Sequence, residues 1–303
     1  MYKISFFSYK GGSGRSSALV NTIPFLAKKL EANSDHPIVL MDMDMDSTGL
    51  TYLLHQGNSI AGHLTVQQTM VEGVPGSTDH SPDLQEHAFF SKLLKVGGEF
   101  GMEEGAVLLL PAAAGETVGE DGSNRNISGG RDSGHLKRIE SLCTSYRCTA
   151  LVYDSSAGDQ DTATLSNSKA DVIVCCMRPT IQFQEGTLDY FRRMNRIVHN
   201  KEVILMPNAV SRAKVNVDGE MYPISAKNRI IEAFEKAFPD TGNTIRLDAF
   251  FDGKFGIPLV QRFLWQETIL KNLDPSALTE DEKEALDMYD YTASLIVKYG
   301  KTE

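Results

Sequence analysis

The residues that most constrain this chain are 4–17, ISFFSYKGGSGRSS, where a short apolar run leads into a glycine-rich turn and then into a helix-like segment. Several backbone N–H groups must come close to a phosphate to bind it, and glycine permits that approach. Gly11, Gly12 and Gly14 meet this requirement. A helix that begins near Ser16 would direct the positive end of its dipole to the same point. The pattern predicts a phosphate-binding loop, and a glycine-rich turn without a ligand is the alternative.

This loop differs from the common pattern G-x-x-x-x-G-K-[ST], because Tyr9 replaces the first glycine and Arg15 replaces the lysine. Lys10 stands instead at the head of the loop. The arrangement resembles the deviant Walker A motif of the ParA/MinD family of ATPases, and within that family a branch with K-G-G-x-G-R-[ST]. The resemblance implies ATP and Mg²⁺ as ligands. It also implies a homodimer on ATP binding, in which Lys10 reaches across to the partner's phosphates and stabilises charge there.

The order of apolar and periodic segments indicates the fold class. Strands are expected at Lys3–Ser8, Ile38–Met43, Ala106–Leu110, Ala150–Tyr153, Val172–Met177 and Val203–Met206. Helices are expected at Ser16–Leu30, His135–Tyr146, Gln182–His199, Ala226–Phe238 and Glu280–Tyr299. Continuous apolar strands that alternate with helices predict an α/β fold, with a mostly parallel twisted sheet and helices on both of its faces. The resemblance implies the P-loop NTPase form of this fold.

The length and composition favour one domain. With 303 residues, of which 41% are apolar, the chain is expected to form a single nucleotide-binding domain over residues 1–303. Residues 56–135 contain short apolar patches among Gly, Pro and His, and they are predicted to be an insertion of helices and loops. Within it, residues 113–134 are poor in apolar side chains and are predicted to form a mobile loop.

Three aspartates occur at every second position at the end of the second predicted strand: Asp42, Asp44 and Asp46. In an extended strand they would share one face and repel one another, so we expect the chain to leave the sheet near Asp44. At the carboxyl edge of a parallel sheet, that exit faces the phosphate site. The segment resembles the family's D-x-D element, which implies that Asp44 positions or polarises the attacking water and that Asp42 lies near the outer shell of the metal. A solvated acidic turn is the alternative, and Asp46 has no assigned role.

A fourth aspartate, Asp154, ends the apolar run TALVYD. A strand that holds one carboxylate rigidly beside a phosphate loop can bind magnesium-bound water or the loop hydroxyl. Together with Asp42, which the resemblance places near the metal, the predicted metal-binding residues are Ser16 and Asp154. By the resemblance, the N–H of Gly158 would face the γ-phosphate, and Arg15 would neutralise phosphate charge where lysine usually stands.

Later segments complete the predicted nucleotide site. Asn208 follows a strand, where its amide can bond an adenine edge, although asparagine is as often a plain loop former there. GIPLVQRFLW around Pro258 resembles the family's base-flanking segment, and Thr180 or Gln182 is expected near a helix start. The predicted nucleotide-binding residues are Gly11, Gly12, Ser13, Gly14, Arg15, Ser16, Ser17, Asn208 and Pro258. The predicted catalytic residues are Lys10, Asp44 and Arg15.

The charge balance restricts the possible partners. Lys and Arg total 30 against 40 Asp and Glu, and a net charge of −10 disfavours general binding to DNA or anionic lipid. The basic group Arg192, Arg193, Arg196 and Lys201 is more often a solvated face than a DNA contact. No signal peptide or membrane-length apolar stretch is found, so a cytoplasmic protein without membrane attachment is expected. The four cysteines match no metal-binding spacing and are expected to be buried thiols.

Three classes of function fit these features. The first is a switch ATPase that hydrolyses ATP slowly, dimerises with ATP and regulates a partner protein of unknown identity. The second is a module that binds ATP without significant hydrolysis, which the replacement of the loop lysine by Arg15 favours. The third is an ATP-dependent ligase or synthetase on the same scaffold, with residues 56–135 as a substrate lid.

Overall fold

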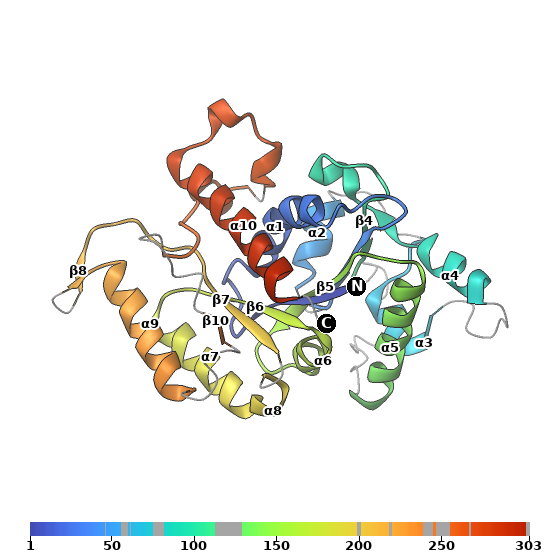
Figure 1. Cartoon of the computed structure of the whole chain (residues 1–303), viewed down its shortest axis with the longest axis horizontal. Coiled ribbons are helices and arrows are strands. Elements are labelled where there is room, and N and C mark those ends of the chain that lie inside the picture. The colour runs from blue at the N-terminus through green and yellow to red at the C-terminus, as the bar shows by residue number, and fades with distance from the viewer. Residues whose placement is uncertain are drawn as a thin grey trace, which may run out of the picture.

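The structure is a computed structural model that describes residues 1–45, 47–55, 60, 62–74, 82–112, 129–198, 201–217, 220–238, 245–246, 255–266 and 268–300. The strands of the main sheet are β1 (Tyr2–Ser8), β2 (Ile38–Asp42), β3 (Leu94–Lys95), β4 (Val107–Leu110), β5 (Ala150–Ala157), β6 (Val172–Met177), β7 (Glu202–Pro207) and β10 (Ile245–Arg246). β8 (Asn216–Val217) and β9 (Glu220–Met221) form a separate hairpin, which projects from the body of the molecule (Figure 1).

The α-helices are α1 (Arg15–Lys29), α2 (Gly49–His55), α3 (Val66–Glu72), α4 (Pro82–Phe90), α5 (Gly129–Ser145), α6 (Asp161–Lys169), α7 (Ile181–Arg193), α8 (Asn195–Val198), α9 (Ile224–Ala237) and α10 (Glu280–Tyr299). Short 3₁₀ helices are η1 (Gly97–Phe100), η3 (Gln261–Leu264), η4 (Leu270–Asn272) and η5 (Pro275–Ala277).

The main sheet has the strand order β10-β7-β6-β1-β5-β2-β4-β3, with β3 antiparallel to β4 and the other pairs parallel. β1 lies between β6 and β5, at the point where the order of the strands reverses. Parallel strands place their carboxyl ends on one edge, and a reversal in their order leaves a crevice for ligands there. The topology thus brings the ends of β1, β2, β5, β6 and β7 to one edge.

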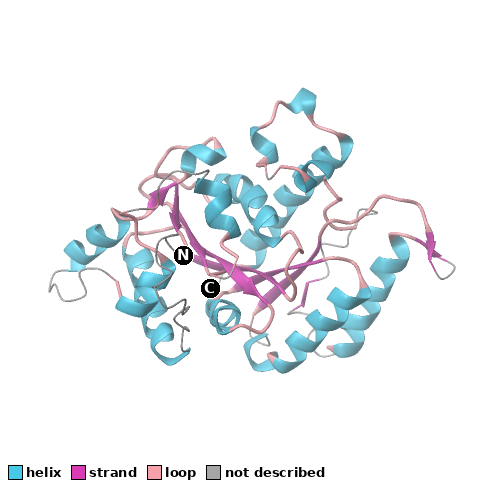
Figure 2. Ribbon diagram, turned by 180° about the vertical axis from the view of Figure 1, so that it is seen from behind, coloured by secondary structure: helices cyan, strands magenta, loops and turns pink. Residues whose placement is uncertain are grey.

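Helices cover both faces of the sheet, as the predicted α/β fold requires (Figure 2). Ile4 and Phe6 of β1 join one core, under α1, α2 and α10, whereas Phe7 joins a core under α7 and α9. This alternation follows from the period of two in a strand. A third core lies under α3, α4 and α5, around Tyr153.

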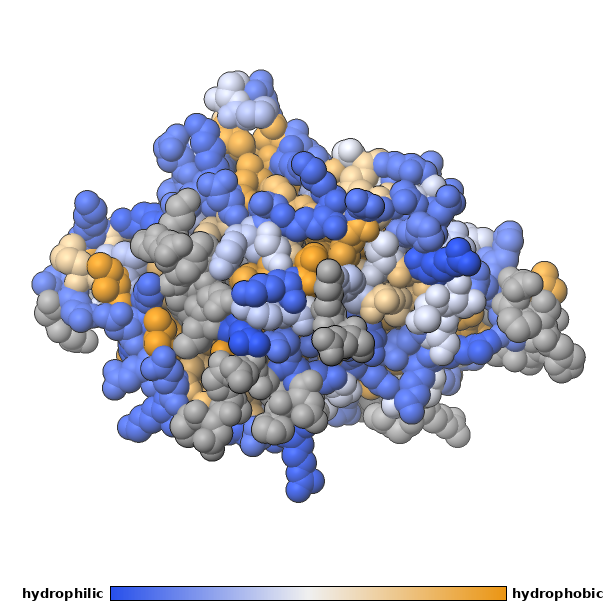
Figure 3. All heavy atoms as spheres, viewed as in Figure 1, coloured by the Kyte–Doolittle hydropathy of each residue, from blue (hydrophilic) through white to orange (hydrophobic). Residues whose placement is uncertain are grey.

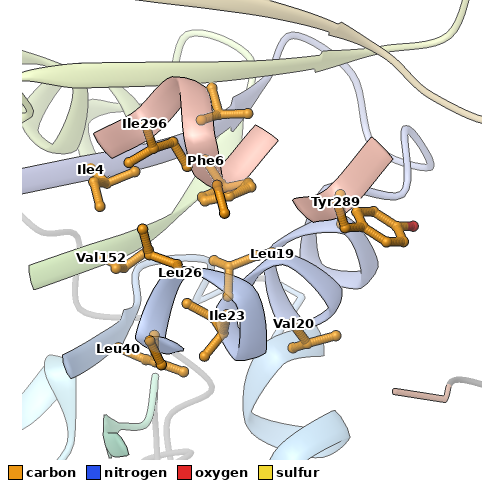
Figure 4. Close-up of a cluster of buried hydrophobic side chains, with 14 of the residues drawn as sticks. Ile4, Phe6, Leu19, Val20, Ile23, Leu26, Leu40, Val152, Tyr289 and Ile296 are labelled. Carbon is orange, nitrogen blue, oxygen red and sulfur yellow. The ribbon is translucent and has the colours of Figure 1, made fainter. Parts of the chain in front are cut away.

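The first core is built largely by α1 and α10. Leu19, Ile23 and Leu26 of α1 are fully buried, and they lie near Ile4, Phe6 and Ile296 (Figure 4). The spacing of the α1 residues at three and four positions places them on one face of the helix. Because α1 follows the glycine-rich loop directly, this packing fixes the start of the helix beside the edge of the sheet.

The expected strands and long helices are present, with differences at several boundaries. Helix α2 and strands β3, β8, β9 and β10 are further elements that the sequence analysis did not predict. β5 continues past Tyr153 to Ala157, because it pairs with β1 as far as Ser8. β2 ends at Asp42, one residue before the predicted end at Met43, which confirms the expectation that the chain leaves the sheet near Asp44. The predicted helix at 182–199 is divided into α7 and α8, and its end lies outside the described residues. Helix α6 is present where the sequence analysis expected no element.

The segment predicted as an insertion, residues 56–135, is built into the main sheet where it is described. β4 pairs with β2, and β3 pairs with β4, so the segment forms one border of the sheet. Helix α5 begins at Gly129, which corrects the prediction of a loop through residue 134. Once a helix is nucleated, each further residue adds a hydrogen bond at low cost, so the helix extends toward its amino end. Residues 113–128 and Asp46 lie outside the described residues.

Candidate functional site

The glycine-rich loop occupies residues 9–14, between the end of β1 and the start of α1. Gly12 and Gly14 have φ of 72° and 76°, in the left-handed region that favours glycine. The carbonyl oxygen of Gly14 accepts the first helical bond of this turn from the N–H of Ala18, at 2.9 Å. The 15-residue helix α1 therefore starts at the loop and directs its positive end there.

Two side chains hold three successive carbonyl groups of the loop. Arg178 Nε donates to the Gly12 carbonyl at 2.8 Å. Asn208 Nδ2 donates to the carbonyls of Ser13 and Gly14 at 2.8 and 3.1 Å. Arg178 directly follows β6 and Asn208 directly follows β7, so neighbouring strands supply both donors. With their carbonyl groups bound in this way, successive N–H groups are left for an anion.

Arg15 lies between two carboxylates. Its Nε donates to Asp154 Oδ1 at 2.6 Å, and its Nη2 donates to Asp44 Oδ2 at 2.8 Å. Arg15 and Asp44 are each 7% exposed and Asp154 is fully buried. Burial by itself lowers the pKa of Arg15, but the charges of Asp154 and Asp44 outweigh burial and raise its pKa overall. The structure thus places the loop cation on the two predicted carboxylates.

Asp42 is fully buried and is bonded to the protein at both oxygens. Oδ2 accepts from the N–H and hydroxyl of Thr51 at 2.9 and 2.6 Å, and Oδ1 accepts from the N–H of Asp44 at 3.2 Å. Burial, and then the charge of Asp154, raise the pKa of Asp42 to about 7. These bonds fix the turn after β2. In this structure both carboxylate oxygens of Asp42 are bonded to the protein. Its predicted place near the outer shell of a metal stays a prediction.

Ser16 and Asp154 form a hard-oxygen pair that fits Mg²⁺. Ser16 Oγ donates to Asp154 Oδ2 at 2.7 Å, so one hydroxyl and one carboxylate lie side by side at the start of α1. Burial raises the pKa of Asp154, and the charge of Arg15 and the Ser16 hydroxyl oppose that rise. Mg²⁺ prefers oxygen ligands and is usually held by few protein groups together with phosphates and waters. No group of three or more His, Cys, Asp or Glu able to hold a metal is found in the described part of the chain.

The other predicted loop residues lie at or beside the loop. Ser13 is buried, Ser17 is half-buried on α1 and Gly11 is exposed. Lys10 is half-buried, and its ammonium has no ion pair or hydrogen bond among the residues described. The N–H of Gly158 donates to the Ser8 carbonyl at 3.1 Å. This bond closes the end of β5 along β1 in this structure, and contact of the Gly158 N–H with a phosphate stays a prediction.

The segments that contain Asn208 and Pro258 lie side by side, although they are far apart in the sequence. Val210 pairs with Pro258 in a parallel bridge, and the N–H of Val210 donates to the Ile257 carbonyl at 2.9 Å. Asn208 is 6% exposed, and its oxygen accepts from the N–H of Ala209 at 2.9 Å. Its amide is therefore engaged with the loop in this structure, and contact with adenine stays a prediction. Sequence analysis missed Arg178, for which its place directly after a predicted strand was the available signal.

Comparisons with known proteins agree with this geometry at the level of fold. No protein-family model matches the chain, and no curated protein has significant sequence similarity to it. Among solved structures, the chain is similar to the MinD cell division protein of Aquifex aeolicus, with 17% identity, TM-score 0.61 and coverage of 100% of this chain and 98% of that one. That MinD is also known in a complex with MinC.

Two further solved structures show the same likeness. The ATP complex of a single-residue variant of McdA from Cyanothece has 14% identity and TM-score 0.60, over 100% of this chain and 98% of that one. Cobyrinic acid a,c-diamide synthase of Mycobacterium smegmatis, bound to an ATP analogue and magnesium, has 11% identity and TM-score 0.58, over 100% and 96%. The resemblance inferred from the loop is thereby confirmed in the fold: the chain has the fold of the MinD/ParA-type P-loop ATPases.

Proposed function

We propose that this protein is a switch ATPase that binds ATP with Mg²⁺, hydrolyses it slowly, dimerises in the ATP-bound state and regulates a partner protein. One observation carries the proposal. Asp44 and Asp154 converge on Arg15, and Ser16 bonds to Asp154, at the end of a glycine loop with two left-handed glycines. A phosphate-binding loop beside buried carboxylates and a hydroxyl has the parts that phosphoryl transfer requires.

Each residue has a role in this proposal. The N–H groups of residues 11–17 bind the phosphates, with the positive end of α1 behind them. Ser16 and Asp154 would hold Mg²⁺, which neutralises phosphate charge when it is bound. Asp44 orients the attacking water. Lys10 of each subunit contacts the phosphates of the other subunit, where it stabilises the charge that develops during cleavage. Because its ammonium is not engaged elsewhere among the described residues, Lys10 is free for this contact.

A second candidate is ATP binding without significant hydrolysis, and the Arg15 geometry favours it. Asp44 accepts from Arg15 at 2.8 Å and from the N–H of Ser47 at 3.2 Å, so both of its oxygens are engaged. A carboxylate held in an ion pair is a weaker water acceptor than a free one. Hydrolysis would then require Arg15 to leave Asp44 when phosphates arrive.

A ligase or synthetase is the third candidate. The cobyrinic acid a,c-diamide synthase named above carries out small-molecule synthesis on a similar fold. This candidate predicts that ATP cleavage depends on an added metabolite, and that residues 56–135 form the substrate lid. The switch and the ligase are therefore separated by whether phosphate is released from ATP alone.

The decisive experiment combines light scattering with phosphate release, with and without ATP and Mg²⁺. We expect wild type to form a dimer with ATP that dissociates as phosphate appears, and Asp44→Ala to retain the dimer without turnover. Lys10→Ala should lose both the dimer and turnover. A dimer without phosphate release identifies the binding module, and release that requires a metabolite identifies the ligase. A wild type indifferent to ATP in both assays would refute the switch and would favour the binding module or the ligase.

The location of the protein and the class of its partner are also part of the proposal. Within the helices that the structure describes, none is both long and apolar enough to cross a membrane. Hydrophilic residues, with several hydrophobic patches between them, form the described part of the face shown in Figure 3. Of the basic group on α7 and α8, Arg193 is paired with Asp159 and Asp189. We propose a single-domain cytoplasmic protein whose partner is another protein, with DNA not favoured.

A further inference from the structure

Arg178 is a cation that bonds the glycine loop, and the proposed function gives it no contact with the nucleotide. It directly follows β6, which pairs with β1, and β1 leads into the loop. Its Nε donates to the Gly12 carbonyl at 2.8 Å, although the side chain as a whole is exposed. Its two Nη groups have no hydrogen-bond or ion-pair partner among the described residues. Arg178 therefore presents unused N–H donors and a full positive charge next to the loop.

The other arginine at the loop is engaged elsewhere. The guanidinium of Arg15 spans Asp154 and Asp44, and it is 7% exposed. Two carboxylates more than offset one guanidinium, so this group brings no net positive charge to a phosphate. A polyphosphate carries several negative charges and needs nearby cations in addition to backbone N–H groups. In the described part of this edge, Lys10 and Arg178 are the cations left for that purpose.

The backbone around Arg178 is held in place by its neighbours. The N–H of Thr180 donates to the Arg178 carbonyl at 2.8 Å. Arg229, from α9, donates to the Pro179 carbonyl and to Gln184 Oε1, each at 3.0 Å. Gln184 is itself buried on α7. Arg178 thus stands on a braced segment, and a braced segment positions a binding side chain more accurately than a free loop does.

We propose that Arg178 is a polyphosphate-binding residue of this site. Its Nε orients the glycine loop through the Gly12 carbonyl, and its Nη groups contact phosphate oxygens beyond the first phosphate of the ligand. The planar guanidinium can make both kinds of bond at once, which the ammonium of lysine cannot reproduce. The identity of the ligand, a nucleoside triphosphate, rests on the proposed function.

The test compares Arg178→Ala, Arg178→Gln and Arg178→Lys with wild type by calorimetric titration with Mg-ATP and with AMP. Gln keeps an N–H donor for Gly12 but loses the charge. We expect Ala and Gln each to weaken ATP binding about 10-fold to 100-fold, the equivalent of one charged hydrogen-bonding group. Lys should fall between them and wild type, and AMP binding should change by less than about 3-fold. Arg192→Ala is the matched control, because Arg192 is an exposed arginine on α7.

The inference is overturned if Arg178→Ala binds ATP as wild type does, or if its loss is equal for AMP and ATP. It is also overturned if Gln binds ATP as wild type does while Ala does not, because the role is then loop support alone. Should Ala fail to fold, Gln and Lys carry the test. If wild type binds no ATP, the proposed function fails. Titration with inorganic tripolyphosphate then tests whether Arg178 binds polyphosphate. If wild type binds tripolyphosphate and Arg178→Gln does not, the inference is supported. If wild type does not bind tripolyphosphate, the inference is refuted.

Discussion

Arg15 is the residue on which the electrostatics of the site depends. Its removal would leave Asp154, fully buried, and Asp44, 7% exposed, without a counter-charge. Breaking a buried ion pair from one side is strongly destabilising. We expect Arg15→Ala to lower the free energy of unfolding by about 3–5 kcal/mol in urea titrations. Arg15→Lys should lower the free energy of unfolding by less, because lysine keeps the positive charge and loses only the planar guanidinium that bonds both carboxylates.

The matched variant is Arg15→Ala combined with Asp154→Asn. Removing the charge of Asp154 relieves part of the penalty, so the double variant should be more stable than Arg15→Ala alone. The ion pairing of Arg15 with Asp154 would be contradicted if the double variant lost as much free energy of unfolding as Arg15→Ala and Asp154→Asn lose in sum.

Asp42 gives a prediction of pH dependence. Burial and the charge of Asp154 raise the pKa of Asp42 to about 7 from an ordinary value of 3.8. Between these values the folded protein keeps a proton that the unfolded chain has released. The stability that Asp42 contributes is therefore fully present below about pH 4 and is lost as the pH rises through 7. Relative to Asp42→Asn, wild type should lose about 1.4 kcal/mol of unfolding free energy per pH unit between roughly pH 5 and 6.5.

Urea unfolding at fixed pH values measures this difference. Glu280→Gln is the control, because Glu280 is 92% exposed and its substitution should leave the pH profile nearly unchanged. A difference between wild type and Asp42→Asn that stays constant with pH would exclude a raised pKa at Asp42.

At the scale of the element, the turn into α1 depends on one glycine. Gly14 has φ of 76°, and a Cβ there would lie 2.6 Å from Asn208 Nδ2. A side chain in this conformation costs about 1–2 kcal/mol before any clash. We expect Gly14→Ala to lower the free energy of unfolding by at least that amount. Gly11→Ala should change it by less than about 1 kcal/mol, because nothing lies within 4 Å of the added Cβ. Equal losses in the two variants would contradict the loop geometry.

At the scale of the whole molecule, the one tryptophan reports on the surface. Trp265 follows η3 and is 85% exposed, whereas the aromatic side chains of Phe6 and Tyr289 in the first core are buried. We expect acrylamide to quench its fluorescence in the folded protein nearly as well as in urea. Strong protection in the folded protein would show that this segment is covered. If protection appears when ATP is added, ATP binding covers this segment, either by the nucleotide itself or by the partner subunit of the proposed dimer.

The parts that could be predicted from the sequence are those with local causes. The strands were recognisable because apolar residues are continuous there, and the loop because its glycines and its following helix adjoin in the chain. The predicted ends of strands were less accurate where pairing with a neighbouring strand determines the end. β5, for example, continues to Ala157 because it pairs with β1. Helices α3 and α4 were expected only as unspecified helices and α2 was not expected, since short amphipathic segments give weak periodicity.

The amino-acid sequence by itself determined the α/β class and the glycine loop, because apolar runs and glycines act through their immediate neighbours. Only the tertiary structure decided which partners Arg15 and Arg178 have. Asp154 is 139 residues from Arg15, and Gly12 is 166 residues from Arg178. These contacts depend on β1 lying between β5 and β6, an order set by the packing of crossover helices on both faces. No local pattern specifies that order, and so the partners of both arginines could be found only in the folded molecule.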